Sequence, residues 1–405
     1  MSEATLRRTL EHLGRLVAFD TRNPPRAIAG DAGLFAYLRD MLQRSGLACD
    51  TVDLGDGCVY LLAVRGAPQV LFNVHVDTVP ADPGWTADPH VLRVADGRAI
   101  GLGACDIKGA AACLLSVLET TTGPAAVLFS SDEEAGSSRC IREFLARSDL
   151  SPRTSDLSSG PADAPFTDLS TRTSDLSPRT SAPRHPTFRS VVVGEPTRCR
   201  AVLEHRGIGT ATAAFSGTGG HASAARALRD SAVHEAVRWA SLALARAGES
   251  EAAGSAGPLR GLRLNLGAVE GGLKANMIAS AAAVRFGVRP PPELPPAAAL
   301  AELFALAPDP ERVRFTPGFL APPLPAGGPG RLAEARAAAA ALAERLGLPP
   351  GDPVDFWTEA ALFSAAGCNV LVYGPGSIEQ AHTAGEYVPL ADLVEAATRY
   401  RAILS

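Results

Sequence analysis

The sequence predicts an α/β fold with a partly parallel sheet, interrupted by a smaller α+β module. Over residues 1–200, short apolar runs alternate with helix-length amphipathic segments, the pattern of successive βα units. Strand-like segments dominate residues 201–320, and the first pattern returns over 321–405. We therefore expect two domains, one assembled from 1–200 and 321–405 and the other from 201–320.

Each expected element follows from its apolar spacing. In the first part, helices are predicted at 6–19, 33–46, 107–118 and 137–145, and strands at 59–64, 70–74, 125–129 and 191–193. In the middle part, strands are predicted at 201–215, 262–269, 281–288 and 312–316, with helices at 231–247 and 297–306. The last part predicts helices at 331–346, 359–366 and 390–404 and a strand at 369–373.

Residues 148–189 interrupt the alternation. The octamer Ser-Asp-Leu-Ser-Pro-Arg-Thr-Ser occurs at 148–155 and again at 174–181. The segment is rich in Ser, Thr, Pro and Asp, so it cannot bury enough apolar surface to offset its ordering entropy. We predict a disordered, low-complexity insertion within the larger domain, produced by local duplication.

Composition excludes several classes of function. The chain has 46% apolar residues and a net charge of −5, which gives no basic surface for nucleic acid or an anionic membrane. The apolar stretches all fall short of the roughly 18 uncharged residues that a membrane span needs. The seven cysteines are scattered and form no C-x-x-C pair, as expected of reduced thiols. These features predict a cytoplasmic protein without a signal peptide.

Acidic and imidazole side chains follow the apolar strands of the larger domain. They are His75, Asp77, Asp106, Glu133, Glu134, Glu195 and, near the C-terminus, His382. Side chains at such positions are expected to project from one edge of the sheet into a shared cleft. Two imidazoles and several carboxylates in one place suit a pair of divalent metals, and zinc fits this ligand set.

Taken singly, each of these residues has a simpler explanation. A histidine on an apolar strand is usually a core residue, a Glu-Glu pair is usually solvated, and Asp106 could cap the helix that follows it. Taken together, the residues favour a metal site, because burying so many carboxylates without a cation would cost several kcal/mol per charge.

Five ordered motifs carry a family resemblance. They are His-Val-Asp-Thr-Val-Pro at 75–80, Gly-Leu-Gly-Ala-Cys-Asp-Ile-Lys-Gly at 101–109, Ser-Asp-Glu-Glu-Ala-Gly at 131–136, Gly-Glu-Pro-Thr at 194–197 and His-Thr-Ala-Gly-Glu-Tyr-Val at 382–388. With them the chain resembles the dizinc aminoacylase/carboxypeptidase/deacetylase family, over its whole length except 148–189. The resemblance implies a zinc-exopeptidase-like catalytic domain with a mixed central sheet, and an inserted α+β lid and dimerisation domain.

The resemblance also implies a role for each residue. One zinc ion would be held by His75, Glu195 and a bridging Asp106, and the other by Glu134, His382 and the same Asp106; Co²⁺ can substitute. Asp77 would orient His75. Glu133 would act as general acid and base on a water whose pKa the metals lower toward about 7.

Residues of the inserted module complete the expected site. The resemblance implies that His221 reaches across a homodimer interface to stabilise the oxyanion, and that Asn276 and Arg289 contact the substrate carboxylate. Arg206 could line the same pocket or be structural. Ala279 and Gly287 depart from the family pattern, where proline and an acidic residue are common, so the strand around Arg289 is expected to sit differently.

The implied activity is removal of the acetyl group from an N-acetyl amino acid, N-acetylornithine or N-acetylcitrulline, in arginine biosynthesis. Two alternatives stay open. The same metal centre would serve a succinyl-diaminopimelate desuccinylase or a dipeptidase of the family. From another class, the chain could be a catalytically degenerate binding protein, against which the complete ligand set and Glu133 count.

Overall fold

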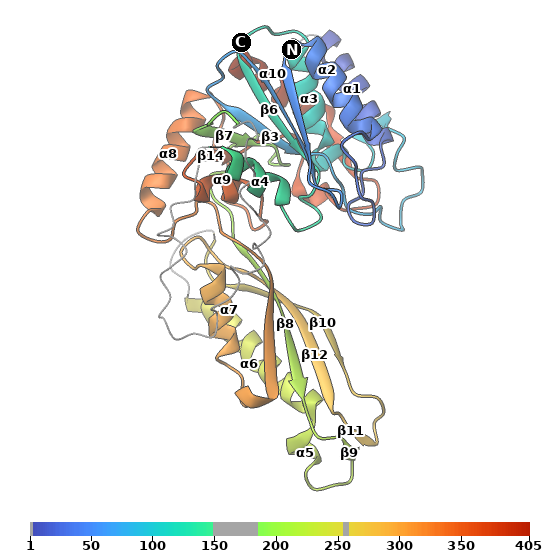
Figure 1. Ribbon diagram of the computed structural model, residues 1–405, viewed down its shortest axis with the longest axis vertical. Helices are drawn as coiled ribbons and strands as arrows, with labels where there is room; N and C mark the ends of the chain where they lie inside the picture. The colour runs from blue at the N-terminus through green and yellow to red at the C-terminus, as the bar shows by residue number, and fades with distance from the viewer. Residues whose placement is uncertain (1–2, 149–184, 254–258) are drawn as a thin grey trace. The chain divides into compact units, whose positions relative to one another are not determined.

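The computed structural model describes residues 3–148, 185–253 and 259–405, and the chain divides into two compact units (Figure 1). Unit 1 comprises Met1–Cys199 and Leu362–Ser405, and unit 2 comprises Arg200–Ala361. Most of the predicted insertion 148–189 lies outside the described residues. Its two flanks meet, because the His185 amide donates a hydrogen bond to the Arg147 carbonyl (3.2 Å).

Unit 1 is built on a six-stranded mixed sheet with strand order β1-β2-β6-β3-β7-β14. The strands are β1 (Ala48–Asp53), β2 (Val59–Arg65), β6 (Ala125–Ser130), β3 (Leu71–His75), β7 (Ser190–Val193) and β14 (Asn369–Val372). β6, β3, β7 and β14 run parallel, whereas β1 and β2 are antiparallel to their neighbours. The mixed α/β sheet that the sequence predicted is confirmed.

Helices cover both faces of this sheet. α1 (Glu3–Ala18), α3 (Gly109–Leu118) and α10 (Leu390–Leu404) pack together, and α10 reaches β3 where the Tyr400 ring meets Phe72 (centroids 5.2 Å apart). On the opposite face, Phe144 of α4 (Arg139–Arg147) meets Tyr60 of β2 (6.2 Å). α3 is buried along its whole length, which explains its run of small and apolar residues. The remaining helix of the N-terminal part is α2 (Gly33–Arg44).

Unit 2 contains a four-stranded antiparallel sheet with order β10-β12-β8-β13. The strands are β10 (Arg263–Gly271), β12 (Ala281–Arg289), β8 (Ile208–Ser216) and β13 (Val313–Ala321). α6 (Ala232–Ala253) and α7 (Pro296–Phe304) cover one face, as Figure 1 shows. Trp239 of α6 lies at the centre of this core and packs on Phe215, Phe286 and Phe315. A short pair, β9 (Gly220–His221) and β11 (Met277–Ile278), and helix α5 (Ala227–Asp230) lie near one end of the sheet.

The boundaries of unit 2 differ from the expected 201–320. Residues 321–361, which include α8 (Leu332–Arg345), belong to the same compact unit because their backbone bonds back to its first residues. The Ala201 amide donates to Pro349, and His205 exchanges two backbone hydrogen bonds with Leu324. For the same reason the strand predicted at 201–215 begins only at Ile208, since 201–206 forms isolated bridges instead.

Candidate metal centre

Four of the predicted site residues lie at the carboxyl ends of three neighbouring parallel strands. His75 is the last residue of β3, Glu133 and Glu134 occupy the turn after β6, and Glu195 follows β7. Ligands of open α/β sheets gather at this edge because the loops after parallel strands meet there. These four residues therefore lie at one edge of the sheet.

The Asp106 turn enters the same region between β5 (Arg98–Ile100) and α3. It begins at Gly103, whose φ of +74° is rare for residues with a side chain, and a Cβ there would lie 2.6 Å from Thr78 Cγ2. Glycine is thus required for the turn to approach Thr78, in the segment that follows β3. The helix that the sequence predicted from residue 107 begins at Gly109, which leaves Asp106 in an irregular turn.

Asp106 directs its two oxygens to two different histidines. Its Oδ1 lies 3.1 Å from His75 Nε2, and its Oδ2 lies 3.5 Å from His382 Nε2. Glu195 Oε2 lies 3.8 Å from His75 Nε2, and Glu134 Oε1 lies 2.9 Å from His382 Nε2. Two groups of three potential ligands result, His75–Asp106–Glu195 and Asp106–Glu134–His382, with the atoms of each group within 4.8 Å of one another.

The spacing of these atoms fits zinc. Tetrahedral zinc with bonds of about 2.0–2.1 Å places its ligand atoms about 3.3 Å apart, and the four contacts from 2.9 to 3.8 Å bracket that value. Each group supplies one imidazole and two carboxylates, counting Asp106 twice. Three protein ligands leave a fourth position open, as in catalytic rather than structural zinc sites.

Burial makes the cluster costly without a cation. Asp106 and Glu195 are 7% and 5% exposed, and burial raises the pKa of Glu195 to about 7. Hydrogen bonds that His382 donates to the carboxylates of Asp106 and then Glu134 raise the pKa of His382 to about 10. For Asp106, burial opposes ionisation, but the two histidines outweigh it and lower its pKa. Ionised carboxylates in this cluster therefore need a positive charge beside them, and a divalent ion would supply it.

Asp77 connects the two groups of ligands. Its Oδ1 lies 3.4 Å from His75 Nδ1, and its Oδ2 accepts a hydrogen bond from the Glu134 backbone amide (2.9 Å). Asp77 is fully buried, so it can fix the orientation of the imidazole, as a carboxylate behind a metal-bound histidine does. Glu133 is half-buried in the turn after β6 and belongs to neither ligand group.

Sequence reasoning missed the role of Glu386. This carboxylate is 2% exposed and accepts three backbone hydrogen bonds, from Gly103 to Oε2 (2.9 Å) and from Cys105 and Asp106 to Oε1 (2.9 and 3.0 Å). It therefore holds the backbone that carries the shared ligand. Its place in the same C-terminal motif as His382 was the available signal. His382 itself has a φ of +59°, an uncommon conformation for a non-glycine residue.

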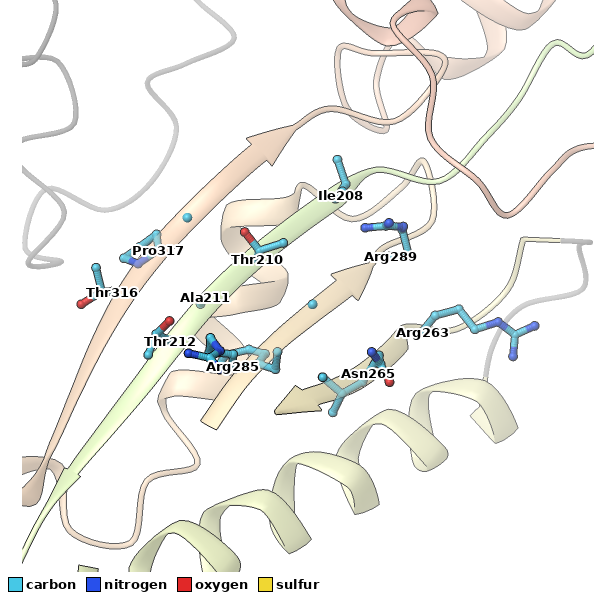
Figure 2. Close-up of a pocket in the computed structure, with 15 residues that line it drawn as sticks. Ile208, Thr210, Ala211, Thr212, Arg263, Asn265, Arg285, Arg289, Thr316 and Pro317 are labelled. Carbon is cyan, nitrogen blue, oxygen red and sulfur yellow. The ribbon is translucent and has the colours of Figure 1, made fainter. Parts of the chain in front are cut away.

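The predicted residues of unit 2 fall into two places. His221 and Asn276 are neighbours, since β9 pairs with β11 and the Ala222 amide donates to the Asn276 carbonyl (3.1 Å). Arg289 lies at the far end of β12, as Figure 2 shows, about 26 Å from the start of that strand at about 3.3 Å per residue. Within one chain, Arg289 and Asn276 therefore do not contact one small substrate together.

Arg206 is structural. It is fully buried, ion-paired with Asp355, and donates to the carbonyls of Gly261 (2.7 Å), Arg260 (3.0 Å) and Arg289 (3.3 Å). The sequence left open whether Arg206 lines the pocket or is structural. The packing supports a structural role, because the guanidinium donates its hydrogen bonds to backbone oxygens.

The fold and the ligand groups together define a metal-dependent hydrolase of the zinc-exopeptidase type. The chain belongs to peptidase family M20/M25/M40, whose model matches residues 71–405. Solved structures share the fold: an M20 family metallo-carboxypeptidase from Sulfolobus solfataricus aligns with a TM-score of 0.66 at 15% identity, covering 100% of this chain and 99% of that one. The predicted family and fold class are confirmed.

Within this family, the chain is similar to deacetylases of N-acetyl amino acids. The chain is 50% identical over 385 residues to an N-acetyl-L-citrulline deacetylase from Xanthomonas campestris pv. campestris, covering 95% of this chain and 94% of the relative. It is 30% identical over 404 residues to an acetylornithine deacetylase from Myxococcus xanthus, covering 94% and 93%. The sequence prediction of an amide-hydrolysing deacetylase agrees with both relatives.

Proposed function

We propose that the protein removes the acetyl group from N-acetylcitrulline, and that it does so in arginine biosynthesis. The position of Asp106 supports metal-dependent hydrolysis most directly, because this residue offers one oxygen to each of two histidine-containing ligand groups. The observation that favours citrulline over ornithine is the 50% identity to an N-acetyl-L-citrulline deacetylase, against 30% to an acetylornithine deacetylase.

Two zinc ions fit the ligand groups, one with His75, Glu195 and Asp106 and the other with Glu134, His382 and Asp106. When bound, the metals polarise the acyl carbonyl and lower the pKa of a water toward about 7. Glu133 takes a proton from that water as the water oxygen bonds to the acyl carbon. It then gives the proton to the amine nitrogen as the amide C–N bond breaks, which releases acetate and the free amino acid. Asp77 keeps His75 oriented throughout.

Residues of unit 2 complete the site in this proposal. Arg289 supplies a guanidinium for the substrate carboxylate, because its planar donors match two carboxylate oxygens. His221 stabilises the negative charge on the attacked oxygen, and its Nδ1 is fixed by the Ser223 hydroxyl (2.7 Å). We assign His221 and Asn276 to the active site of a partner subunit, because within one chain they lie at the opposite end of β12 from Arg289.

A homodimer through unit 2 follows from this assignment. Apolar side chains are exposed on α6 and at the β10 edge: Val237 is 58% exposed, Leu244 51%, Val269 61% and Leu273 86%. β10 is also an edge strand with unpaired backbone groups. A second copy would cover both features. Light scattering should give twice the chain mass, and Val269→Glu should shift it toward the single chain and lower turnover together.

We also place the protein in the cytoplasm. All seven cysteines are free, as expected where thiols stay reduced. Among the described residues, the structure offers no helix with the length and apolarity to cross a membrane.

Steady-state rates on N-acetylcitrulline, N-acetylornithine, N-acetylglutamate and N-succinyl-diaminopimelate test the proposal. Acetylcitrulline should have the highest kcat/KM, with activity lost on chelation and restored by zinc or Co²⁺. Preference for the succinyl substrate would support the alternative desuccinylase. Zinc binding without turnover of any amide, dipeptides included, would support the degenerate binding protein.

A further inference from the structure

The turn between β6 and α4, residues 131–138, contains a buried carboxylate that the proposed mechanism does not use (Figure 1). Asp132 is fully buried and belongs to neither group of potential metal ligands. It directly precedes Glu133, the proposed general acid and base. A carboxylate at this depth needs hydrogen-bond donors around it, so the partners of Asp132 indicate its role.

The Asp132 side chain joins the two ends of the turn. Its Oδ2 accepts hydrogen bonds from the Ser137 hydroxyl (2.7 Å) and from the Arg139 backbone amide (2.5 Å). The Cys140 backbone amide donates to both carboxylate oxygens (3.3 Å each). Residues 133–136, which include both glutamates of the metal centre, therefore lie between two ends that one side chain holds together.

Helix α4 uses the same carboxylate at its N-terminus. Ser138, which precedes the helix, has a φ of +45° and forms no side-chain capping hydrogen bond. The first backbone amides of a helix have no partner inside the helix and need an acceptor from outside. Asp132 supplies this acceptor, and a carboxylate also interacts favourably with the positive end of the helix dipole. The turn is thereby attached to the start of a helix.

The two glutamates of the turn are anchored differently. The Glu134 backbone amide donates to Asp77 Oδ2 (2.9 Å), which lies outside the turn. The Glu133 carbonyl instead accepts from the Gly136 amide (3.0 Å), a bond within the turn. The position of Glu133 thus depends on closure of the turn, whereas Glu134 has an anchor on another segment. Asp132 provides that closure.

We propose that Asp132 is a positioning residue for Glu133. By attaching the turn to the N-terminus of α4, it holds the general acid and base where that group can take a proton from water. The inference rests on the proposed function for the role of Glu133, and adds the residue that fixes its place. A displacement of about 1 Å at a reacting group can cost about 100-fold in rate. Loss of Asp132 should therefore lower kcat.

Steady-state kinetics of Asp132→Ala on N-acetylcitrulline test this role. The kcat should fall at least about tenfold while KM stays within about twofold of wild type, because Asp132 is assigned no contact with substrate. Zinc content should match wild type, since Glu134 keeps its bond to Asp77. Asp132→Asn should restore most of kcat, because its amide oxygen still accepts from the helix amides and the Ser137 hydroxyl can turn to accept from its NH₂ group.

Ala146→Gly is the matched control. Ala146 is exposed on α4, so a glycine there weakens the helix without changing the turn. The urea midpoint should fall in both Asp132→Ala and Ala146→Gly, whereas kcat should fall in Asp132→Ala alone. Equal kcat values in these two variants, an Asp132→Asn protein as slow as Asp132→Ala, or loss of zinc from Asp132→Ala would each overturn the proposal.

Ser137→Ala provides a second variant if Asp132→Ala does not fold. It removes the hydrogen bond within the turn and leaves the bonds from Asp132 to the helix amides in place. The kcat should fall severalfold, with KM and the zinc content of wild type. An unchanged kcat in Ser137→Ala would contradict the dependence of Glu133 on closure of the turn.

Hydrogen exchange separates this inference from the proposed function, because it needs no turnover. In the zinc-loaded full chain, the peptide 131–138 should exchange faster in Asp132→Ala than in wild type, and at the wild-type rate in Ala146→Gly. Unchanged exchange in Asp132→Ala would refute the positioning role even in an active enzyme. Absence of wild-type turnover on every N-acetyl amino acid, with the exchange difference intact, would refute the proposed function alone.

Discussion

Removing the Glu386 carboxylate should disturb both metal positions, although Glu386 belongs to neither ligand group. Its oxygens satisfy the backbone amides of Gly103, Cys105 and Asp106. Glu386→Ala leaves three buried donors without an acceptor, at about 1–3 kcal/mol each unless water replaces the side chain. We expect a loss of roughly 3–9 kcal/mol in the free energy of unfolding, which is comparable with the whole stability of a typical protein, about 5–15 kcal/mol.

Glu386→Gln is the more informative change. The amide oxygen can still accept from Cys105 and Asp106, but its NH₂ group then faces the Gly103 amide, so about one hydrogen bond is lost, or about 1–3 kcal/mol. The loss is reduced because burial raises the pKa of Glu386 to about 7, and the neutral amide avoids the cost of a buried charge. A net loss of about 1–2 kcal/mol follows, with the Asp106 turn less firmly held.

Urea unfolding and zinc titration of the Glu386→Gln protein provide the measurement. Zinc affinity should fall at both positions, by about 10–100-fold, the effect typical of residues that support a metal ligand. Glu379→Gln is a suitable control, since Glu379 is exposed in the same segment and, within the part of the chain that the structure describes, forms its ion pair with Arg198 at the surface. If Glu386→Gln bound two zinc ions with unchanged affinity, or lost only one position, the positioning argument would be refuted.

Four further outcomes are expected. Glu133→Gln should retain zinc while kcat falls by about 10²–10⁴-fold. Glu134→Gln should instead lose zinc, and its activity should partly recover with added metal. The reverse pattern would show that the two roles are exchanged. Asp106→Ala should lower the zinc content at both positions, and His75→Ala at one of them. A wild-type protein that never binds more than one zinc ion per chain would contradict the sharing of Asp106 between two ions. Replacing 149–184 by a short linker should leave melting and turnover nearly unchanged; loss of either would show that the segment supports the fold. Burial lowers the pKa of His205 to about 4. As the pH falls below about 6.5, the unfolded chain therefore binds a proton that the folded chain does not, and the free energy of unfolding should drop by up to about 3 kcal/mol by pH 4. Urea midpoints that fall as steeply with pH in His205→Gln as in wild type would contradict this.

The sequence was sufficient for the strands that position the site. β3, β6 and β7 are buried on both faces, so their mostly apolar sequences could be recognised as strands. β1 and the pair β4 (Arg93–Ala95) and β5 were missed because their partly exposed residues show no apolar alternation. β15 (Tyr387–Pro389), which pairs with β5, was missed because only three residues form it.

The candidate ligands could be proposed from the sequence because residue type, and for several of them the position after a strand, both indicate metal chemistry. Glu386 could not be assigned in the same way, since its partners are backbone amides some 280 residues earlier in the chain. The limits of unit 2 were also beyond sequence patterns. They depend on isolated bridges between 201–206 and 321–361, which leave no periodic signal.

The hydrogen bond between the His185 amide and the Arg147 carbonyl also bears on how this chain could have changed in length. The described residues on the two sides of 149–184 meet at this point, so the fold sets no distance that the intervening residues must span. Doubling the length of such a loop costs only about 0.6 kcal/mol of closure entropy. Duplication of an octamer there, which the copies at 148–155 and 174–181 indicate, would therefore change the free energy of unfolding very little.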